Sequence, residues 1–220
     1  MLFRSIATPF AAFAGAAATI TAVYFLGQRE GQLDSYTLLL AGIICVSFFS
    51  AVIIFLMTTL SGSNFRGMAF WLMGDLSVPA PVATGWLFLV LALGVGSIYT
   101  TAADLNLMLS GEQEAMHLGV DVTRVKLVVY ISASVLTGLA VSVSGAIGYV
   151  GILVPHVMRF FFGSDYRVLL PVSALGGAIA IVVADALARS MVAPRELPVG
   201  AITAMVGAPV FLYLLRRRPQ

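Results

Sequence analysis

The sequence predicts an all-α membrane protein, a polytopic bundle whose helices cross a lipid bilayer. Of its 220 residues, 60% are hydrophobic and only 10% are charged, and the mean hydropathy is +1.02. A soluble domain needs about a quarter charged residues to cover its surface. Because the charges here also lie between long apolar runs, we predict a single transmembrane domain over residues 1–220.

Seven apolar runs have the length of a membrane span or come close to it. They cover about 7–26, 37–60, 84–103, 126–144, 147–162, 168–188 and 198–215. A helix needs about 20 residues to cross the hydrocarbon. The fifth run is shorter, and Gly145 and Gly148 separate it from the fourth, so we expect it to be tilted or buried among its neighbours.

A short segment, "NFRGMAFWLMGDL" at 64–76, lies between the second and third runs. It is too short to span the bilayer, and it mixes apolar side chains with charges, namely Phe70, Trp71, Met73, Arg66 and Asp75. This mixture predicts a helix that lies at the membrane interface or dips partway into the bilayer.

The distribution of lysine and arginine predicts the orientation of the chain. If the C-terminus is cytoplasmic, that side carries eight basic residues: Arg29, Arg124, Lys126, Arg159, Arg167, Arg216, Arg217 and Arg218. The other side then carries four, namely Arg4, Arg66, Arg189 and Arg195. Because cytoplasmic loops are enriched in basic residues, this bias favours a cytoplasmic C-terminus. Seven crossings then place Met1 outside.

The largest polar stretch on the cytoplasmic side is residues 104–126. Carboxylates that would complement a helix dipole indicate a helix start there (Ser110, Glu112, Glu114). A short apolar face and a helix stop follow (Ala115, Met116, Leu118, Gly119). Two interpretations stay open: an amphipathic helix that docks on a soluble partner, and a solvated linker helix.

The sequence contains no catalytic constellation, so we expect the chain itself not to be an enzyme. His117 and His156 lie on different segments, without carboxylates or cysteines at metal-ligand spacing, which disfavours a zinc or haem site. A single cysteine, Cys45, excludes an internal disulfide, and no phosphate-binding loop is present. We expect no metal and no cofactor, and no nucleic-acid partner, because the basic residues lie at span ends.

Asp185 and Arg189 lie four residues apart in "ADALARS", near the outer end of the sixth run. Unpaired charges in lipid are costly, so we predict an ion pair within one helix. A proton relay is the alternative, although a carboxylate neutralised by an arginine is poorly suited to that role.

The stretch "GAIGYVGILVPHVMRFFFG" at 145–163 contains polar and helix-breaking residues within an apolar run. Pro155 removes a backbone donor, His156 can donate to a freed carbonyl, and Arg159 can reach the cytoplasmic edge. Together with Gly148 and Gly151, these residues predict a broken helix packed against its neighbours, as architecture or as part of a substrate path.

Four motifs in the second half of the chain resemble the C-terminal part of the FecCD family, the permease subunits of ABC importers for iron–siderophores, haem and vitamin B12. They are G-x-I-G-[FY]-V-G-x-x-V-P-H at 145–156, R-x-L-L-P-x-S-A at 167–174, A-D-x-x-A-R at 184–189 and E-L-P-V-G-x-x-T-A-x-x-G-A-P-x-F at 196–211. Upstream, "LLLAGI" at 38–43, "FWLMGDL" at 70–76 and "LGVDVTRVK" at 118–126 also fit, so the resemblance covers nearly the whole chain.

The resemblance implies a ten-span permease that forms a homodimer in the bacterial inner membrane. A cytoplasmic ABC ATPase attaches on one side and a substrate-binding protein docks outside. The loop at 104–126 would couple to the ATPase through Glu114, Ala115, Leu118, Gly119 and Val120. Phe70, Trp71, Met73 and Gly74 would belong to the outer gate segment, and 147–162 would be a short eighth span.

The chain departs from the family in length, since members carry three further spans ahead of the part that matches Met1. We therefore expect an N-terminally truncated permease, or a genuine short form. Two other function classes stay open: a secondary transporter, which would need an unpaired carboxylate such as Asp185, and a membrane subunit that docks a partner without transporting.

Overall fold

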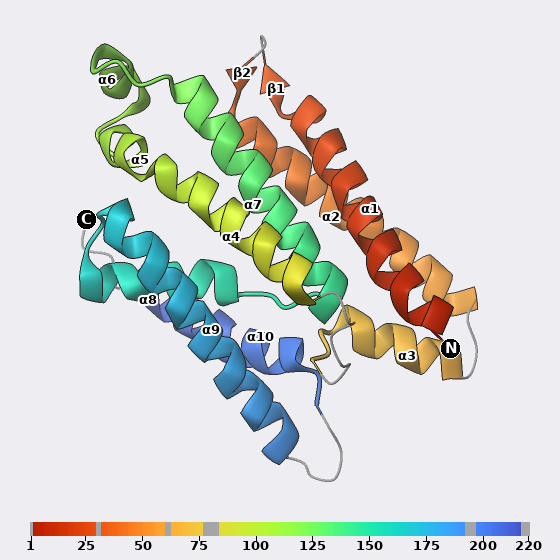
Figure 1. Cartoon of the computed structure of the whole chain (residues 1–220). Helices are drawn as coiled ribbons and strands as arrows, with labels where there is room; N and C mark the ends of the chain where they lie inside the picture. The colour runs from red at the N-terminus through yellow and green to blue at the C-terminus, as the bar shows by residue number, and fades with distance from the viewer. Residues whose placement is uncertain (1, 30–31, 60–62, 77–83, 192–196, 217–220) are drawn as a thin grey trace. The chain divides into compact units, whose positions relative to one another are not determined.

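The computed structural model describes residues 2–29, 32–59, 63–76, 84–191 and 197–216 (Figure 1). Ten helices and a two-stranded hairpin lie in these ranges. Their bounds are α1 Leu2–Leu26, β1 Gln28–Arg29, β2 Gln32–Leu33, α2 Ser35–Thr59, α3 Ser63–Leu72, α4 Thr84–Thr100, α5 Ala102–Met108, α6 Glu112–His117, α7 Val122–Ser144, α8 Val150–Phe162, α9 Tyr166–Ser190 and α10 Val199–Arg216. Arg195, Arg217 and Arg218, used above for orientation, lie outside the described residues.

All seven predicted apolar runs are helices, which confirms the all-α membrane class. Within the described residues, three helices are long and apolar enough to cross a bilayer alone: α2, α7 and α9. A fourth span is possible if α4 and α5 act together, although they are bent by 45° at Thr101. Three other apolar stretches of the described residues, Phe10–Leu26, Val150–Phe162 and Val199–Leu214, are shorter, so packing against neighbouring helices would help them to sit in a bilayer.

The described residues fall into two compact units. The first contains α1, α2, the start of α3 and α4 to α7; the second contains the end of α3 and α8 to α10. The boundaries lie within α3 and at the last residue of α7. A single domain over the whole chain therefore stays a prediction, and each unit is described by itself.

In the first unit, a hairpin connects α1 to α2. Its two strands pair in antiparallel register, with Gln28 opposite Leu33 and Arg29 opposite Gln32. Asp34 caps α2, since its carboxylate accepts the Thr37 backbone N–H at 2.8 Å and the Thr37 hydroxyl at 2.6 Å. This hairpin had no signal in the sequence analysis. The carboxylate cap ends the hairpin and starts the helix.

Small residues set the crossing of α4 and α7. Ser97 Oγ lies 2.7 Å from Ser132 Oγ, and a Cβ at Gly94 would meet Leu136 at 2.7 Å. Helices in lipid commonly pack by close approach at small residues, with hydrogen bonds between hydroxyl groups across the helices.

In the second unit, α8 packs on α9, and α10 packs on both. Gly176 accommodates Val154 and Met158 between α8 and α9, while Gly207 lies against Tyr149. Ala184, Ala188, Val199 and Ile202 form a small buried cluster between α9 and α10, with Leu76, Ile147 and Leu197 packed against it.

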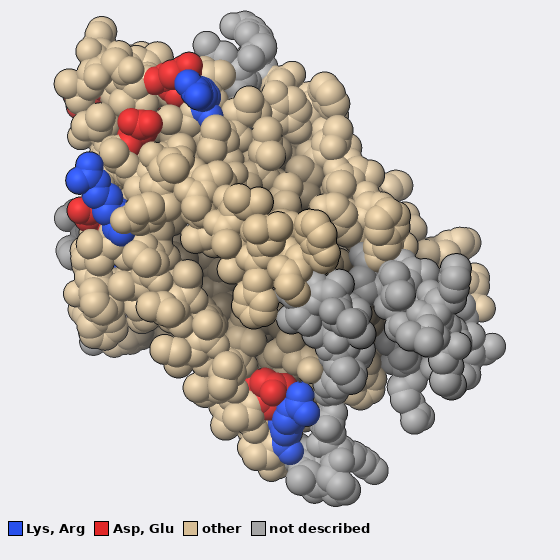
Figure 2. Space-filling model, in the orientation of Figure 1, with Lys and Arg blue, Asp and Glu red and all other residues tan. Residues whose placement is uncertain are grey.

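Charged side chains are sparse on the surface, as the composition predicts. On the face that Figure 2 shows, they gather in a few small groups separated by wide uncharged areas. Long apolar side chains of α2 are largely exposed, including Ile44, Phe48 and Phe55 at 63–68%. Such surface is compatible with lipid or with another helix, not with water.

Candidate functional site

The predicted docking helix is α6, and a glycine flanks each of its ends. Gly111 precedes it with φ +122° and Gly119 follows it with φ +87°. The Gly119 N–H donates to Met116 O at 3.0 Å, and the Val120 N–H donates to Ala115 O at 3.0 Å. These two bonds are a Schellman motif, in which a left-handed residue ends the helix and satisfies its last carbonyls. The predicted helix stop at Gly119 is confirmed.

A buried apolar cluster, here called the α6 core, lies beneath this helix end. Its members are Ala115, Val120, Val122 and Val125, with Leu105, Met108 and Val129 packed against them. Ala115 is fully buried and Val120 is 8% exposed, so the two residues that close the Schellman motif also enter the core. The cluster packs α5, α6 and the start of α7 together at one end of the first unit.

The apolar face that we expected on α6 is wrong in one respect. Ala115 points into the α6 core, whereas Met116 is 54% exposed and Leu118 is 65% exposed. The two larger side chains therefore project away from the unit, beside the exposed Glu114. Two exposed apolar side chains beside a carboxylate are compatible with both interpretations, a docking helix and a solvated linker helix.

Two polar contacts set the geometry around α6, and the sequence analysis missed both. Lys126 Nζ lies 2.7 Å from Glu112 Oε2, which joins α7 to the first residue of α6. Asp121 caps α7 through its carboxylate, which accepts the Arg124 N–H at 3.0 Å. An aspartate ahead of an apolar run could have indicated that cap, but the ion pair spans fourteen residues and has no local signal.

Ser110 was expected to begin the docking helix. Instead α6 begins at Glu112, after Gly111, and no side chain caps it. The acidic residues Glu112 and Glu114 do lie in its first turn, where they complement the helix dipole.

The predicted gate segment ends in a close crossing of three backbones in the second unit, here called the glycine junction: residues 71–75, 144–147 and 198–200. Asp75 N–H donates to Ser144 O at 3.0 Å, and Val199 N–H donates to Gly74 O at 3.1 Å. Gly74 is buried with φ +82°, while Phe70 and Met73 are exposed and Trp71 is half-buried. The structure thus gives Gly74 a packing role and leaves the larger side chains at the surface.

Glycine is needed at this junction because backbone lies where a side chain would begin. A Cβ at Gly145 would overlap the Trp71 carbonyl oxygen, and one at Gly200 would overlap that of Met73. Gly145 also has φ +69°. By contrast, a Cβ at Gly148 or Gly151 would meet nothing within 4 Å. Of Gly145, Gly148 and Gly151, only Gly145 lies where backbone segments approach one another closely.

The break in the stretch 145–163 lies before Pro155, not at it. The non-helical part is 145–149, where Tyr149 has φ +66°, and α8 then runs on through Gly151, Pro155, His156 and Arg159. His156 Nδ1 lies 2.8 Å from Ile152 O, and its ring lies edge-on to Phe211. Arg159 places its guanidinium 5.9 Å from the ring centre of Tyr166. A proline inside a helix is tolerated in membranes where neighbours satisfy the freed carbonyl.

The predicted ion pair is present in α9: Arg189 Nε donates to Asp185 Oδ2 at 2.9 Å, one turn apart. Within the described ranges, no three histidine, cysteine or acidic side chains are grouped as ligands of a metal ion would be.

Comparison with known proteins places this arrangement among transporters. The model of the FecCD transport family matches residues 1–217. The cobalamin import system permease protein BtuC of Halobacterium salinarum is 44% identical over 208 residues, 94% of this chain and 56% of that protein. The hemin transport system permease protein HmuU of Yersinia pestis is 40% identical over 214 residues, 95% of this chain and 63% of that protein.

A solved structure has the same fold. It is an inward-facing conformation of a metal-chelate type ABC transporter, 27% identical, with a TM-score of 0.81 over 96% of this chain and 74% of the solved chain. The chain thus spans less than two thirds of the length of the two named relatives. It is a multi-pass membrane protein and belongs to the FecCD transport family.

Proposed function

We propose that the chain is the membrane permease subunit of an ATP-driven importer for a metal chelate. In this assembly two permease subunits form the pathway, a cytoplasmic ABC ATPase hydrolyses ATP, and an extracytoplasmic protein delivers the substrate. The observation that carries the proposal is the family match over nearly the whole chain.

The substrate class is a metal held inside an organic ligand. The two relatives named above are a cobalamin permease and a hemin permease, and their identities to this chain differ by only four percentage points, 44% against 40%. Identity at this level does not choose between a corrin, a porphyrin and a siderophore. The binding protein, which meets the substrate first, would make that choice.

The helix α6 is the proposed contact with the ATPase. The α6 core fixes its base, and Leu118 and Met116 offer an apolar projection with Glu114 beside it. Central apolar anchors with polar surroundings are typical of residues that dominate binding energy. This assignment follows the orientation that the basic residues predict, with α6 and the C-terminus in the cytoplasm.

The glycine junction and the segment before it would form the outer end of the pathway. Phe70, Trp71 and Met73 precede Gly74, whose backbone is bonded to the start of α10. A movement of α10 would therefore displace the gate segment through this hydrogen bond.

A secondary transporter would need a carboxylate able to exchange protons or bind a cation within the bilayer. Asp185 is engaged by Arg189 at 2.9 Å, which disfavours that use. The paired state of Asp185 supports ATP as the energy source over an ion gradient.

The proposal is tested by affinity purification of the chain from its own membranes, followed by uptake in reconstituted vesicles. We expect an ATP-hydrolysing subunit to co-purify, and ATP-dependent accumulation of one member of a panel of cobalamin, hemin and ferric siderophores. Uptake driven by a proton or sodium gradient without ATP would overturn the proposal. A purified complex with no ATPase and no uptake of any panel member would do the same.

A further inference from the structure

The two ends of α6 are held in different ways. Gly111 and Gly119, at its two ends, both have positive φ, and a Cβ at either would meet nothing within 4 Å. Glycine has more conformational freedom than other residues, and neither position is sterically enclosed. The backbone closes the C-terminal end of α6 through the Gly119 and Val120 hydrogen bonds, whereas no side chain caps its N-terminal end.

Side chains hold α6 at two points of different character. At its C-terminal end, Ala115 and Val120 are buried in the α6 core. At its N-terminal end, Glu112 receives Lys126 Nζ at 2.7 Å, a short charge-assisted contact. The lysine side chain is 21% exposed and the glutamate 51%, so solvent screens the pair in part. Such a pair adds little to stability, but it joins to α7 the N-terminal end of a helix whose C-terminal end is held by the α6 core.

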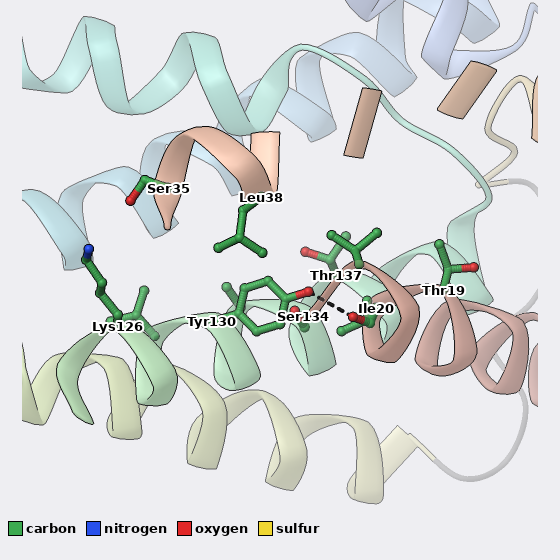
Figure 3. Close-up of a pocket in the computed structure, with 11 residues that line it drawn as sticks. Thr19, Ile20, Ser35, Leu38, Lys126, Tyr130, Ser134 and Thr137 are labelled. Carbon is green, nitrogen blue, oxygen red and sulfur yellow. Dashed lines mark hydrogen bonds between the residues drawn. The ribbon is translucent and has the colours of Figure 1, made fainter. Parts of the chain in front are cut away.

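The lysine also belongs to a face of α7 that contacts α1. Tyr130, one turn further along α7, donates its hydroxyl to Ile20 O at 2.9 Å. Figure 3 shows Lys126 and Tyr130 along the same groove of about 530 Å³, which α1, α2 and α7 line. Two successive turns of α7 are thus joined to α6 on one side and to α1 on the other.

We propose that Lys126 and Glu112 form a positioning pair that makes α6 move together with α7. This inference rests on the proposed function, in which α6 receives force from the ATPase. Motion of the docked α6 reaches α7 through the pair and the α6 core, and passes to α1 through Tyr130. Neither residue contacts substrate or hydrolyses ATP. Without the pair, α6 still docks and its C-terminal end stays in the α6 core, but its N-terminal end is no longer joined to α7.

The test measures substrate moved per ATP hydrolysed in the purified complex. Lys126→Gln and Glu112→Gln should each lower this ratio by about fivefold, the upper range for a partly exposed pair. ATP hydrolysis itself should continue. The charge-exchanged double variant Lys126→Glu/Glu112→Lys should exceed both of its single variants. Arg124→Gln is the matched control, because it removes an exposed positive charge from the same turn of α7 and leaves the pair intact.

A spin label at Gln113, an exposed residue of α6, gives a second measurement that needs no ATPase. It should become more mobile in Lys126→Gln and stay unchanged in Arg124→Gln. Unchanged mobility, or a wild-type ratio in both single neutral variants, would overturn the proposal, and so would a charge exchange without recovery. If the wild-type complex moves no substrate with ATP, the proposed function fails and this inference with it. If the wild type couples normally and the variants do too, only this inference fails.

Discussion

Two regions of the molecule reach a fixed geometry by opposite means. Around α6, buried side chains and an ion pair hold short helices in place, and the flanking glycines have free space around them. At the glycine junction, backbone meets backbone, and side chains are excluded from Gly145 and Gly200. The first arrangement tolerates surface change and presents side chains outward. The second should tolerate almost no substitution, because backbone atoms form its contacts.

The two regions show that a docking surface and a packing junction have different structural requirements. A docking surface needs exposed side chains on a firm base, which Leu118 over the α6 core provides. A junction of three chain segments needs close approach of their backbones, so glycine, which has no Cβ atom, is required there. Substitutions in the two regions should therefore fail in different ways: at the junction by loss of folding, at α6 by loss of coupling.

The largest expected effect is at Gly145. Gly145→Ala places a methyl group on the Trp71 carbonyl oxygen in a backbone conformation with φ +69°. Overpacking and left-handed strain together predict a loss of about 3 kcal/mol or more, enough to prevent stable insertion. The measurement is the yield and melting temperature of the detergent-purified protein.

Gly148→Ala is the matched control for that substitution. It lies three residues away in the same turn-rich segment, with no atom within 4 Å of the added Cβ. We expect wild-type yield and melting temperature. Equal damage from both substitutions would show that the segment resists any change, and that the close backbone crossing is not the cause.

A large functional effect with little structural effect is expected at Leu118. Leu118→Asp puts a charge on a side chain that is 65% exposed, so folding should be nearly unchanged. A desolvated apolar anchor contributes about 2 kcal/mol or more to binding, so ATP-coupled uptake should fall by about thirtyfold. Uptake and melting temperature are measured on the same preparation. Normal uptake in a well-folded variant would remove α6 from the docking surface.

The smallest expected effect is at Gly119, where backbone strain acts without the steric overlap that is present at Gly145. Gly119→Ala meets no atom, so only its φ of +87° penalises the substitution, by about 1 kcal/mol. Gly119→Asn should cost less, because asparagine adopts this conformation more readily. A loss at Gly119→Ala as large as that at Gly145→Ala would contradict the distinction between strain and overlap.

The sequence alone could predict the helices, because their signals are local. Each of the seven apolar runs is a helix, and the stop at Gly119 follows from the freedom of glycine in the left-handed region. The separation of the fourth and fifth runs at Gly145 was also correct, since α7 ends at Ser144 and α8 begins at Val150.

The contacts between residues far apart in the sequence could not be predicted in this way. The pairing of Lys126 with Glu112 depends on how α6 folds back on α7, and the close approach of Gly145 to the Trp71 carbonyl joins segments more than seventy residues apart. Spacing rules describe neighbours on one helix, and neither contact is of that kind. The direction of Met116 and Leu118 was missed for the same reason, since only the α6 core determines which side of the helix is inward.

The central claim is that α6 docks on the ATPase, and site-specific photo-crosslinking tests it most directly. A photoreactive amino acid is placed at Leu118 and, as a control of equal exposure on α9, at Leu175. In native membranes we predict a covalent adduct between position 118 and an ATP-binding subunit, and none from position 175. If the ATPase co-purifies with the chain but position 118 gives no adduct with it, or if position 175 gives that adduct instead, the claim is contradicted.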